Sequence, residues 1–456
     1  MLIEYTIDVN FILYFMCMAE VVDYRPKLAQ SVIDSDIIKI FDNLLTVGVE
    51  EGASDIHIEP MENYSRIRLR IDGELEELIQ FPRNLHESII SKFKIESGQM
   101  RPDEKRLPQD ARVSSVTQTN KEIDLRANTL PTIWWEKLVM RIVDKSKKVP
   151  PLSDLGIEGS NSIIMYKHLE DPNGVFLMTG PTGSGKTATL YACLNHINTP
   201  NINIITYEDP VENKMAGLSQ VQVRSDIGFT FASGLRSALR QDPDVIMVWE
   251  IRDKETLSMA MEAAMTGHLV FSTIHTNSAA ETITRVLNFG AKAYMIAGSF
   301  NLVVAERLAR RSCPKCRKSI SIREKSEYRH ALKSFENYDP EALKKEIKSR
   351  GITEDQWKAF MTDGMMYFGS WKDKHWEDCS LCKWSGYKWR IWLFEMMDYN
   401  DDIKTLLLDG KSAFEIETYA LQHGMINLER DGIFKIIQWV TTLEEVYSYV
   451  KTKIEL

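Results

Sequence analysis

Residues 180–187 read Gly-Pro-Thr-Gly-Ser-Gly-Lys-Thr, a complete phosphate-binding loop. The apolar stretch 175–178 precedes it and a helix-compatible run, 188–192, follows it, so the loop stands in the strand–loop–helix context that the motif requires. Its glycines let the backbone curl until several N–H groups converge on one phosphate at the positive end of the helix. The sequence therefore predicts a nucleoside triphosphate site rather than an empty glycine-rich turn.

Each residue of this loop has an expected role. Lys186 reaches the β- and γ-phosphates, and the Thr187 hydroxyl is a ligand for Mg²⁺. The rest of the loop cradles the phosphates with its backbone, and it consists of Gly180, Pro181, Thr182, Gly183, Ser184 and Gly185.

Carboxylates follow two other apolar stretches. Glu208 ends the strand expected near 204–207, and Glu250 comes two residues after the apolar run 245–248. Strand ends are where an α/β sheet presents catalytic residues, and an apolar strand followed by an acid is the Walker B pattern that holds Mg²⁺. Glu208 is our candidate to polarise the attacking water and Glu250 to hold Mg²⁺, although the two could exchange these roles.

Histidines bracket a further strand. His268 and His275 stand at the two ends of the run 269–273. A single histidine would usually be a core or capping residue, but two around a strand that neighbours a phosphate-binding loop favour a functional role. We therefore expect His275 to belong to the catalytic set.

Arginines are placed where they could stabilise a transferring phosphoryl group. Arg236 and Arg240 share a helix face, and Arg252 follows Glu250. Arg126 and Arg141 lie in the preceding domain. The alternative for each arginine alone is a surface salt bridge, worth about 1 kcal/mol or less.

The periodicity of apolar residues divides the chain. Alternation over 54–59 and 65–71, with Asp72-Gly73 as a hairpin turn, predicts an α+β domain. Beyond the Pro150-Pro151 linker, strands at 175–178, 202–206, 245–248 and 269–273 alternate with helices, which predicts a parallel sheet wrapped by helices. The expected regions are a short leader, the α+β domain, the α/β core, a cysteine-containing charged insertion and a helical tail, at 1–45, 46–148, 152–320, 313–395 and 396–456.

Four of the six cysteines form two C-x-x-C pairs, Cys313 with Cys316 and Cys379 with Cys382. Two thiolates two residues apart can occupy adjacent corners of a tetrahedron, so the pairs predict one Zn²⁺. Four thiolates leave no open position for water, and the expected role is structural. The alternative is a set of unrelated buried thiols or a redox dithiol.

Composition narrows the functional classes. The 456 residues are 44% hydrophobic and 27% charged, which is typical of a soluble globular protein of two or three domains. The net charge of −9 argues against non-specific binding to nucleic acid. The longest apolar stretch, 11–19, is shorter than the roughly 20 residues of a bilayer span and lacks a basic start, so we expect a buried element and a cytoplasmic protein.

Several ordered motifs resemble the secretion-superfamily ATPases that drive type II secretion and type IV pilus assembly. They are Gly52-Ala53-Ser54-Asp55-Ile56-His57-Ile58-Glu59, Arg70-Ile71-Asp72-Gly73-Glu74, Tyr207-Glu208-Asp209-Pro210-Val211-Glu212, Leu239-Arg240-Gln241-Asp242-Pro243-Asp244, and Thr266-Gly267-His268 with Ser272-Thr273-Ile274-His275-Thr276-Asn277. The resemblance runs from about residue 35 to about residue 400.

The resemblance implies a homohexameric ATPase with ATP, Mg²⁺ and Zn²⁺, made of an N-terminal PAS-like α+β domain and a RecA-like domain with nucleotide bound between them. It implies a partner in the inner-membrane platform of a pilus or secretion machine, and so a peripheral location at that membrane. The tetracysteine set is similar to that of the extension and secretion members, so retraction is disfavoured. Arginines that match Arg126, Arg141, Arg236, Arg240, Arg252 and Arg285 contribute to the nucleotide site or to subunit contacts in the family.

The chain departs from the family where glycine usually stands, with tryptophan at 135, 249, 389 and 392. Trp249 matters most, because it adds a large side chain where the backbone should approach the phosphates. Three explanations are open: a compensating cavity, impaired turnover, or a glycine codon that has been read here as tryptophan. The low glycine content, 23 of 456 residues, favours the third. A nucleotide-binding subunit impaired in hydrolysis and a RecA-like nucleic-acid translocase are the alternative functions.

Overall fold

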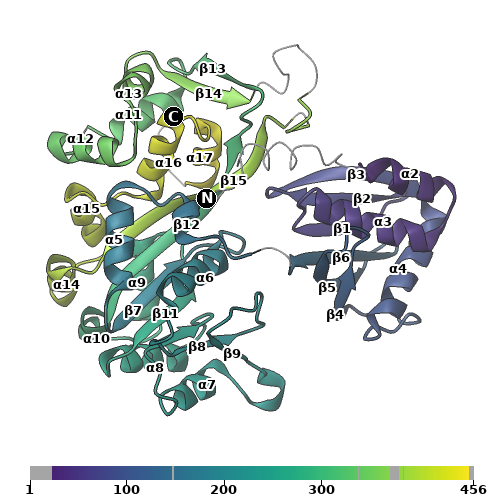
Figure 1. Ribbon diagram of the computed structural model, residues 1–456, viewed down its shortest axis with the longest axis horizontal. Coiled ribbons are helices and arrows are strands. Elements are labelled where there is room, and N and C mark those ends of the chain that lie inside the picture. Colours follow the sequence, from purple (N-terminus) through teal and green to yellow (C-terminus); the bar gives the residue numbers. More distant parts are fainter. Residues whose placement is uncertain (1–22, 146–147, 337, 370–378, 384, 451–456) are drawn as a thin grey trace, which may run out of the picture. The chain divides into compact units, whose positions relative to one another are not determined.

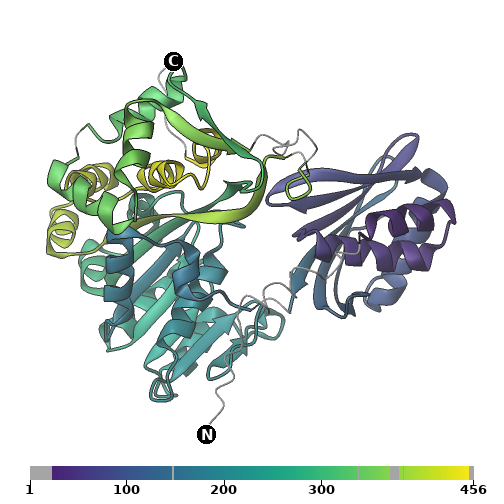
Figure 2. The ribbon, with the colours of Figure 1, turned by 45° about the horizontal axis from the view of Figure 1, so that its top comes forward.

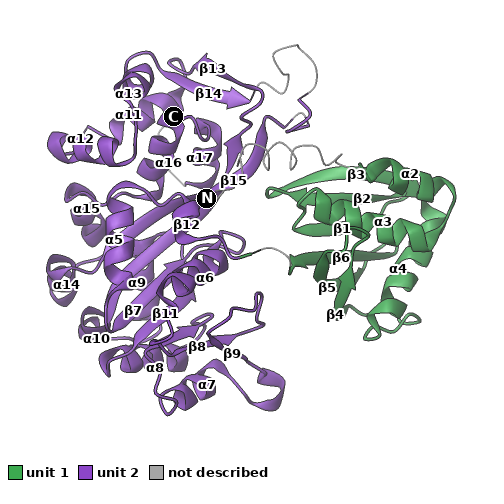
Figure 3. Ribbon diagram, in the orientation of Figure 1, with its two compact units in different colours: residues 1–148 green, residues 149–456 purple. Residues whose placement is uncertain are grey.

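Each of two units in the computed structural model is organised around one large β-sheet. Unit 1 comprises residues 1–148 and unit 2 residues 149–456 (Figure 3). The structure describes residues 23–145, 148–336, 338–369, 379–383 and 385–450, so the apolar stretch 11–19 lies outside the described residues. Among the helices described, none is both long and apolar enough to cross a membrane.

Unit 1 is an antiparallel sheet of six strands in the order β3-β2-β1-β6-β5-β4 (Figure 1). Its strands are β1 (Asp55–Pro60), β2 (Tyr64–Ile71), β3 (Glu74–Pro82), β4 (Gln109–Val116), β5 (Glu122–Pro131) and β6 (Glu136–Asp144). Its helices are α2 (Arg25–Ile33), α3 (Ile37–Glu50) and α4 (Arg83–Ser97). The hairpin turn expected at Asp72-Gly73 joins β2 to β3, with φ angles of +49° and +95°.

Alternation along the strands gives this sheet one buried face. Ile67 and Leu69 of β2 are buried in one core with Phe41 of α3 and Phe93 of α4. The intervening positions, which include the arginines of β2, are only partly buried. Helix α3 begins at Ile37, ahead of the position where alternation suggested that the domain starts, because its apolar face packs into this same core.

Unit 2 contains a seven-stranded sheet in the order β15-β12-β7-β11-β10-β8-β9, parallel except for β15. The strands are β7 (Gly174–Thr179), β8 (Ile204–Glu208), β9 (Ser219–Gln222), β10 (Val245–Val248), β11 (Leu269–Ile274), β12 (Phe300–Ser312) and β15 (Tyr387–Asp398). The four parallel strands predicted from the sequence are confirmed. Strands β12 and β15, which extend the sheet beyond β7, were not predicted.

Helices cover both faces of this sheet (Figures 1 and 2). They are α5 (Gly159–Leu169), α6 (Lys186–Ile197), α7 (Phe231–Ala238), α8 (Lys254–Met265), α9 (Ala279–Asn288) and α10 (Ala293–Ser299), with 3₁₀ turns at Leu152–Leu155 and Ser225–Ile227. Successive residues of β7 are buried in opposite cores. Leu177 lies in the core formed with helices α7, α8, α9 and α10, and Met178 lies in the core formed with α5 and α6. A parallel sheet buried on both faces explains why its strands read as continuous apolar runs.

The remaining elements follow β12. The insertion forms the two-stranded sheet β13 (Arg317–Ser321) and β14 (Met365–Gly369), with α11 (Ser326–Lys333), α12 (Pro340–Ser349) and α13 (Glu354–Met361) between the two strands. After β15 the chain is helical, with α14 (Asp401–Leu408), α15 (Ala413–Gln422), α16 (Leu428–Ile437) and α17 (Leu443–Tyr449). The predicted fold class, an α+β domain followed by an α/β domain with an insertion and a helical tail, is confirmed.

Candidate functional site

The phosphate-binding loop connects β7 directly to α6. Gly180, Gly183 and Gly185 have φ angles of +153°, +82° and +107°, which only glycine adopts without strain. Helix α6 starts at Lys186, so the free N–H groups of its first turn face the loop. The Lys186 ammonium donates hydrogen bonds to the carbonyl oxygens of Gly180 (2.7 Å) and Pro181 (3.0 Å). Burial lowers the pKa of Lys186.

Glu250 lies just beyond the end of β10, with one strand, β11, between it and the loop strand β7. Its carboxylate is 13% exposed and pairs with Arg252 Nε at 2.7 Å and His275 Nε2 at 3.2 Å. The charge of Glu250 also attracts Lys186 and favours its protonated form. The predicted pair of Glu250 and Lys186 is therefore brought to one edge of the sheet.

His275 links this carboxylate to the phosphate-binding loop. Its Nδ1 atom lies 3.1 Å from the carbonyl oxygen of Gly180, and its Nε2 atom faces Glu250. Both partners carry hydrogen-bond acceptor oxygens, and the imidazole ring lies between them. His268, at the opposite end of β11, contacts the carbonyl oxygen of Ala263 at 2.9 Å. The structure thus brings one of the two bracketing histidines to the loop.

Glu208, at the end of β8, is completely buried. Its carboxylate accepts hydrogen bonds from the Tyr191 hydroxyl, from the Thr206 hydroxyl at 2.6 Å and from the Gln220 amide at 3.1 Å. Burial and the charge of Glu208 raise the pKa of Tyr191, which keeps its hydroxyl a donor. In this arrangement, three protein donors already occupy Glu208.

The arginines of unit 2 are dispersed. Arg252 contacts Glu250, whereas Arg236 pairs with Glu255 (3.0 Å) on neighbouring helix α8. Arg240 folds back onto the carbonyl oxygen of Arg236 at 3.2 Å, and the Arg285 guanidinium lies 4.5 Å from the centre of the Phe289 ring. Of these four, Arg252 alone has a described contact with a residue beside the loop.

Unit 1 carries a row of arginines across three strands. Arg112 of β4 pairs in register with Arg126 of β5, which pairs with Arg141 of β6. Cross-strand partners project from the same face of a sheet. Asp55 of β1 ends the row and holds Arg141 Nε at 3.1 Å. These residues line a shallow cavity of about 540 Å³. The row places three arginines on one face of the sheet, and Arg112 was not predicted.

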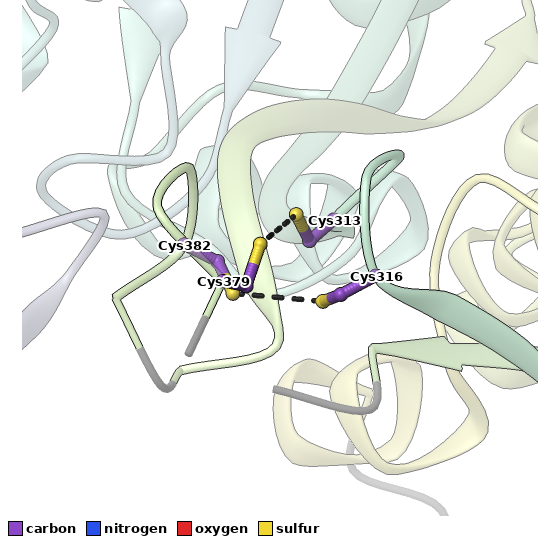
Figure 4. Close-up of side chains that lie close together, drawn as sticks. All are labelled: Cys313, Cys316, Cys379 and Cys382. Atoms are coloured by element: carbon purple, nitrogen blue, oxygen red, sulfur yellow. Dashed lines mark hydrogen bonds between the residues drawn. The ribbon is translucent and has the colours of Figure 1, made fainter. Parts of the chain in front are cut away.

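The four predicted cysteine ligands are brought together at the base of the insertion (Figure 4). All four are buried, and their sulfur atoms lie within 4.8 Å of one another. Cys313 Sγ is 3.8 Å from Cys379 Sγ, and Cys316 Sγ is 3.6 Å from Cys382 Sγ. Four converging thiols are the donor set of a closed tetrahedral zinc site.

The tryptophans that stand where the family usually has glycine differ in their surroundings. The backbone N–H of Trp249 donates to the carbonyl oxygen of Tyr207 (2.9 Å), and the Trp249 carbonyl oxygen accepts from the Thr273 hydroxyl (2.6 Å). These bonds hold the backbone between neighbouring strands, and Trp249 does not have the positive φ that would favour glycine. Trp389 has a φ of +63° at a bulge in β15. The Trp392 indole lies against Gly185, where an added Cβ would stand 2.2 Å from Nε1.

Comparison with known proteins matches residues 30–448 to the family described as type II/IV secretion system protein. The chain is 40% identical over 420 residues to the type IV pilus assembly ATPase PilB of Myxococcus xanthus, covering 92% of this chain and 69% of that protein. It is 36% identical over 432 residues to the type II secretion system protein E of Aeromonas hydrophila, covering 95% and 79%.

Among solved structures, the ATPase DotB of Legionella pneumophila is similar with a TM-score of 0.61 at 19% identity, covering 90% of this chain and 94% of that one. This likeness concerns the fold alone.

Proposed function

Because the chain belongs to the type II/IV secretion system protein family, we propose that it is an ATPase that powers type IV pilus assembly or type II secretion. It acts as a homohexamer at the cytoplasmic face of the inner membrane, where it turns or lifts a platform protein. The observation that carries the proposal is the continuous contact from Gly180 through His275 to Glu250 and Arg252, which joins the phosphate-binding loop to a carboxylate.

In this site the chain's own groups divide the work. The N–H groups of 180–185 and the Lys186 ammonium bind the phosphates of ATP. The Thr187 hydroxyl and the Glu250 carboxylate would hold Mg²⁺, which supplies charge neutralisation at the β- and γ-phosphates when bound. Arg252 stabilises negative charge that develops on the transferring phosphoryl group.

We assign the orientation of the attacking water to Glu250 and its partner His275, and a structural role to Glu208. Glu250 is partly exposed beside the loop, while Glu208 is held by three donors. This assignment differs from both expectations from the sequence, because Glu250 takes the water-orienting role in addition to Mg²⁺ binding and Glu208 takes neither.

Arg126 and Arg141, with Arg112 beside them, bind anionic phosphate groups in the proposed cycle. Their row carries three positive charges, and the carboxylates that line the same cavity are Asp55 and Asp110. We assign Arg236, Arg240 and Arg285 to contacts between subunits, because their described partners are Glu255, the Arg236 carbonyl oxygen and Phe289 rather than residues beside the loop.

The cysteine cluster binds one Zn²⁺ and ties the insertion to the ATPase sheet, since Cys313 follows the end of β12 and Cys379 precedes β15. Zinc binding then contributes to folding stability. We expect elemental analysis to find one zinc per chain. We also expect a chelator to unfold the insertion before it unfolds the seven-stranded sheet. Freely reactive thiols in the native, metal-free protein would contradict this assignment.

A subunit that binds ATP without hydrolysing it is the second candidate, favoured by the Trp392 indole against Gly185 of the loop and by the large residue Trp249 directly before Glu250. A nucleic-acid translocase is disfavoured by the net charge of −9. Salt-sensitive stimulation of turnover by DNA would reverse this preference.

The test is steady-state phosphate release with Mg²⁺ and ATP. Lys186→Ala should abolish turnover, while Lys292→Ala, a change at the helix N-cap of α10, should retain it. A Lys186→Ala variant with wild-type turnover would refute the assignment. Wild-type protein that binds ATP without releasing phosphate would select the second candidate.

A further inference from the structure

Glu306 of β12 lies directly beside the start of the phosphate-binding loop. Strand β12 pairs with β7 so that Ala305 is opposite Thr179, the last residue of β7. The next residues on the two strands, Glu306 and Gly180, are therefore neighbours. A Cβ atom on Gly180 would stand 2.8 Å from the Glu306 carbonyl oxygen, so the absence of a side chain at 180 lets the loop pack against β12.

The Glu306 side chain extends beneath the loop and is completely buried. Its Oε2 atom lies 2.7 Å from the hydroxyl of Thr189 in the first turn of α6. Its Oε1 atom lies 3.4 Å from the hydroxyl of Ser184 within the loop. One carboxyl group thus contacts both halves of the motif, the loop and the helix that follows.

The surroundings of Glu306 favour its neutral form. Burial raises the pKa of Glu306 to about 8, even though Thr189, Lys186, Ser184 and Arg307 act in the opposite direction. At neutral pH the group is therefore a carboxylic acid with one O–H donor. If Oε2 accepts from Thr189, the acid hydrogen on Oε1 can be donated to the Ser184 oxygen, whereas an ionised Oε1 accepts from the Ser184 hydroxyl instead.

We propose that Glu306 is a positioning residue of the phosphate-binding loop that acts in its protonated form, by holding the loop through the buried Ser184 hydroxyl and by anchoring α6 through Thr189. This inference rests on the proposed binding of ATP. On ionisation, the donor to Ser184 is lost and a buried negative charge stands below the triphosphate. Proton binding and nucleotide binding therefore favour each other.

Other titratable groups face Glu306. Lys186 lies above it in the loop, and Arg307, the next residue, donates from Nη1 to the Glu306 carbonyl oxygen at 2.8 Å. The Cys193 thiol of α6 is fully buried, and burial raises its pKa. Of these groups, Lys186 is the one whose deprotonation would also weaken phosphate binding. A test must therefore separate deprotonation of Lys186 from deprotonation of Glu306.

The test measures the Kd for ATP with Mg²⁺ by calorimetry from pH 7 to pH 9.5. Wild-type Kd should rise by up to about tenfold per pH unit above pH 8, because one proton is linked to binding. Glu306→Gln, which keeps the shape and an N–H donor, should remove this rise. Glu306→Ala should bind about tenfold more weakly at pH 7 and should also lack the rise.

Glu395 of β15 supplies the matched control. It is a fully buried carboxyl group whose hydrogen bonds come from the backbone N–H groups of Ala279 (2.6 Å) and Leu428 (3.3 Å), and burial raises its pKa to about 7. Glu395→Gln should keep the wild-type rise in Kd, while a flat profile in that variant would overturn the assignment to Glu306.

A Glu306→Gln variant that retains the wild-type rise would also overturn the proposal and assign the dependence to Lys186. Circular dichroism at each pH identifies a variant that has unfolded, and the comparison of wild type with Glu306→Gln stands without the alanine variant. Wild-type protein that binds no ATP at pH 7 would refute ATP binding itself. The wild-type measurement alone detects this failure, so it is distinct from a failure of the role assigned to Glu306.

Discussion

The ends of β8 and β10 present the same kind of side chain at the same edge of one sheet, in different surroundings. Glu208 is fully buried and accepts hydrogen bonds from Tyr191, Thr206 and Gln220. Glu250 is partly exposed, contacts Arg252 and His275 and attracts Lys186. Position at a strand end therefore does not determine a role. We infer that the availability of carboxylate oxygens does, and the proposed function places the chemistry at the end of β10 and a structural role at the end of β8.

The largest effect that could break this comparison is expected at Arg252. Arg252→Ala should lower turnover about hundredfold, because it removes both a partner of Glu250 and a charge available to the phosphoryl group. Steady-state phosphate release measures it. Arg224→Ala is the control, since Arg224 makes the same kind of pair two residues along the chain, with Asp226 at 3.1 Å. Equal turnover in the two variants would remove Arg252 from the site.

At the β8 end, Tyr191→Phe should affect stability more than catalysis. The change leaves the buried Glu208 carboxylate with one donor fewer, and we expect the free energy of unfolding to fall by about 2 kcal/mol. Urea denaturation measures the loss, with the exposed Tyr294→Phe as control. A variant of wild-type stability with strongly reduced turnover would mean that Glu208 serves the reaction.

Trp249 lies between β10 and Glu250, and its replacement tests whether a large side chain at this strand end slows turnover. Trp249→Gly should raise turnover about tenfold, because a smaller residue lets the strand end approach the phosphates. Unchanged turnover would show that the side chain is accommodated. The mass of the peptide that contains residue 249, taken from protein made in its own source, separates a genuine tryptophan from a glycine codon read as tryptophan.

The smallest effect concerns β15, which reaches the loop through Trp392. Trp389, three residues earlier, has a φ of +63° at a bulge, a conformation that costs a side chain about 1 kcal/mol and that glycine adopts freely. Trp389→Gly should raise the free energy of unfolding by about that amount in urea denaturation. A loss of stability would show that its indole contributes packing that outweighs the strain.

Much of this site could be predicted because its signals are local. The loop at 180–187, the strands that end near Glu208 and Glu250, and the two cysteine pairs each occupy a few adjacent residues. The spacing of Cys313, Cys316, Cys379 and Cys382 predicted a convergence that the structure contains.

The rest depends on contacts between distant segments. Strand β12 was not predicted, because a buried strand and a buried helix read alike in a short apolar run, and Glu306 was missed with it. A lone acid within the apolar run 302–306 was the available signal. The different surroundings of Glu208 and Glu250 arise from Tyr191, Gln220 and His275, which no local pattern links to them.

The most direct test compares Glu250→Gln with Glu208→Gln in single-turnover hydrolysis of ATP already bound to each protein. The measurement isolates chemistry from nucleotide binding. We predict that Glu250→Gln binds ATP but hydrolyses it at least about hundredfold more slowly, while Glu208→Gln stays within about tenfold of wild type. The reverse order, with Glu208→Gln nearly inactive and Glu250→Gln close to wild type, would contradict the assignment of catalysis to the β10 end.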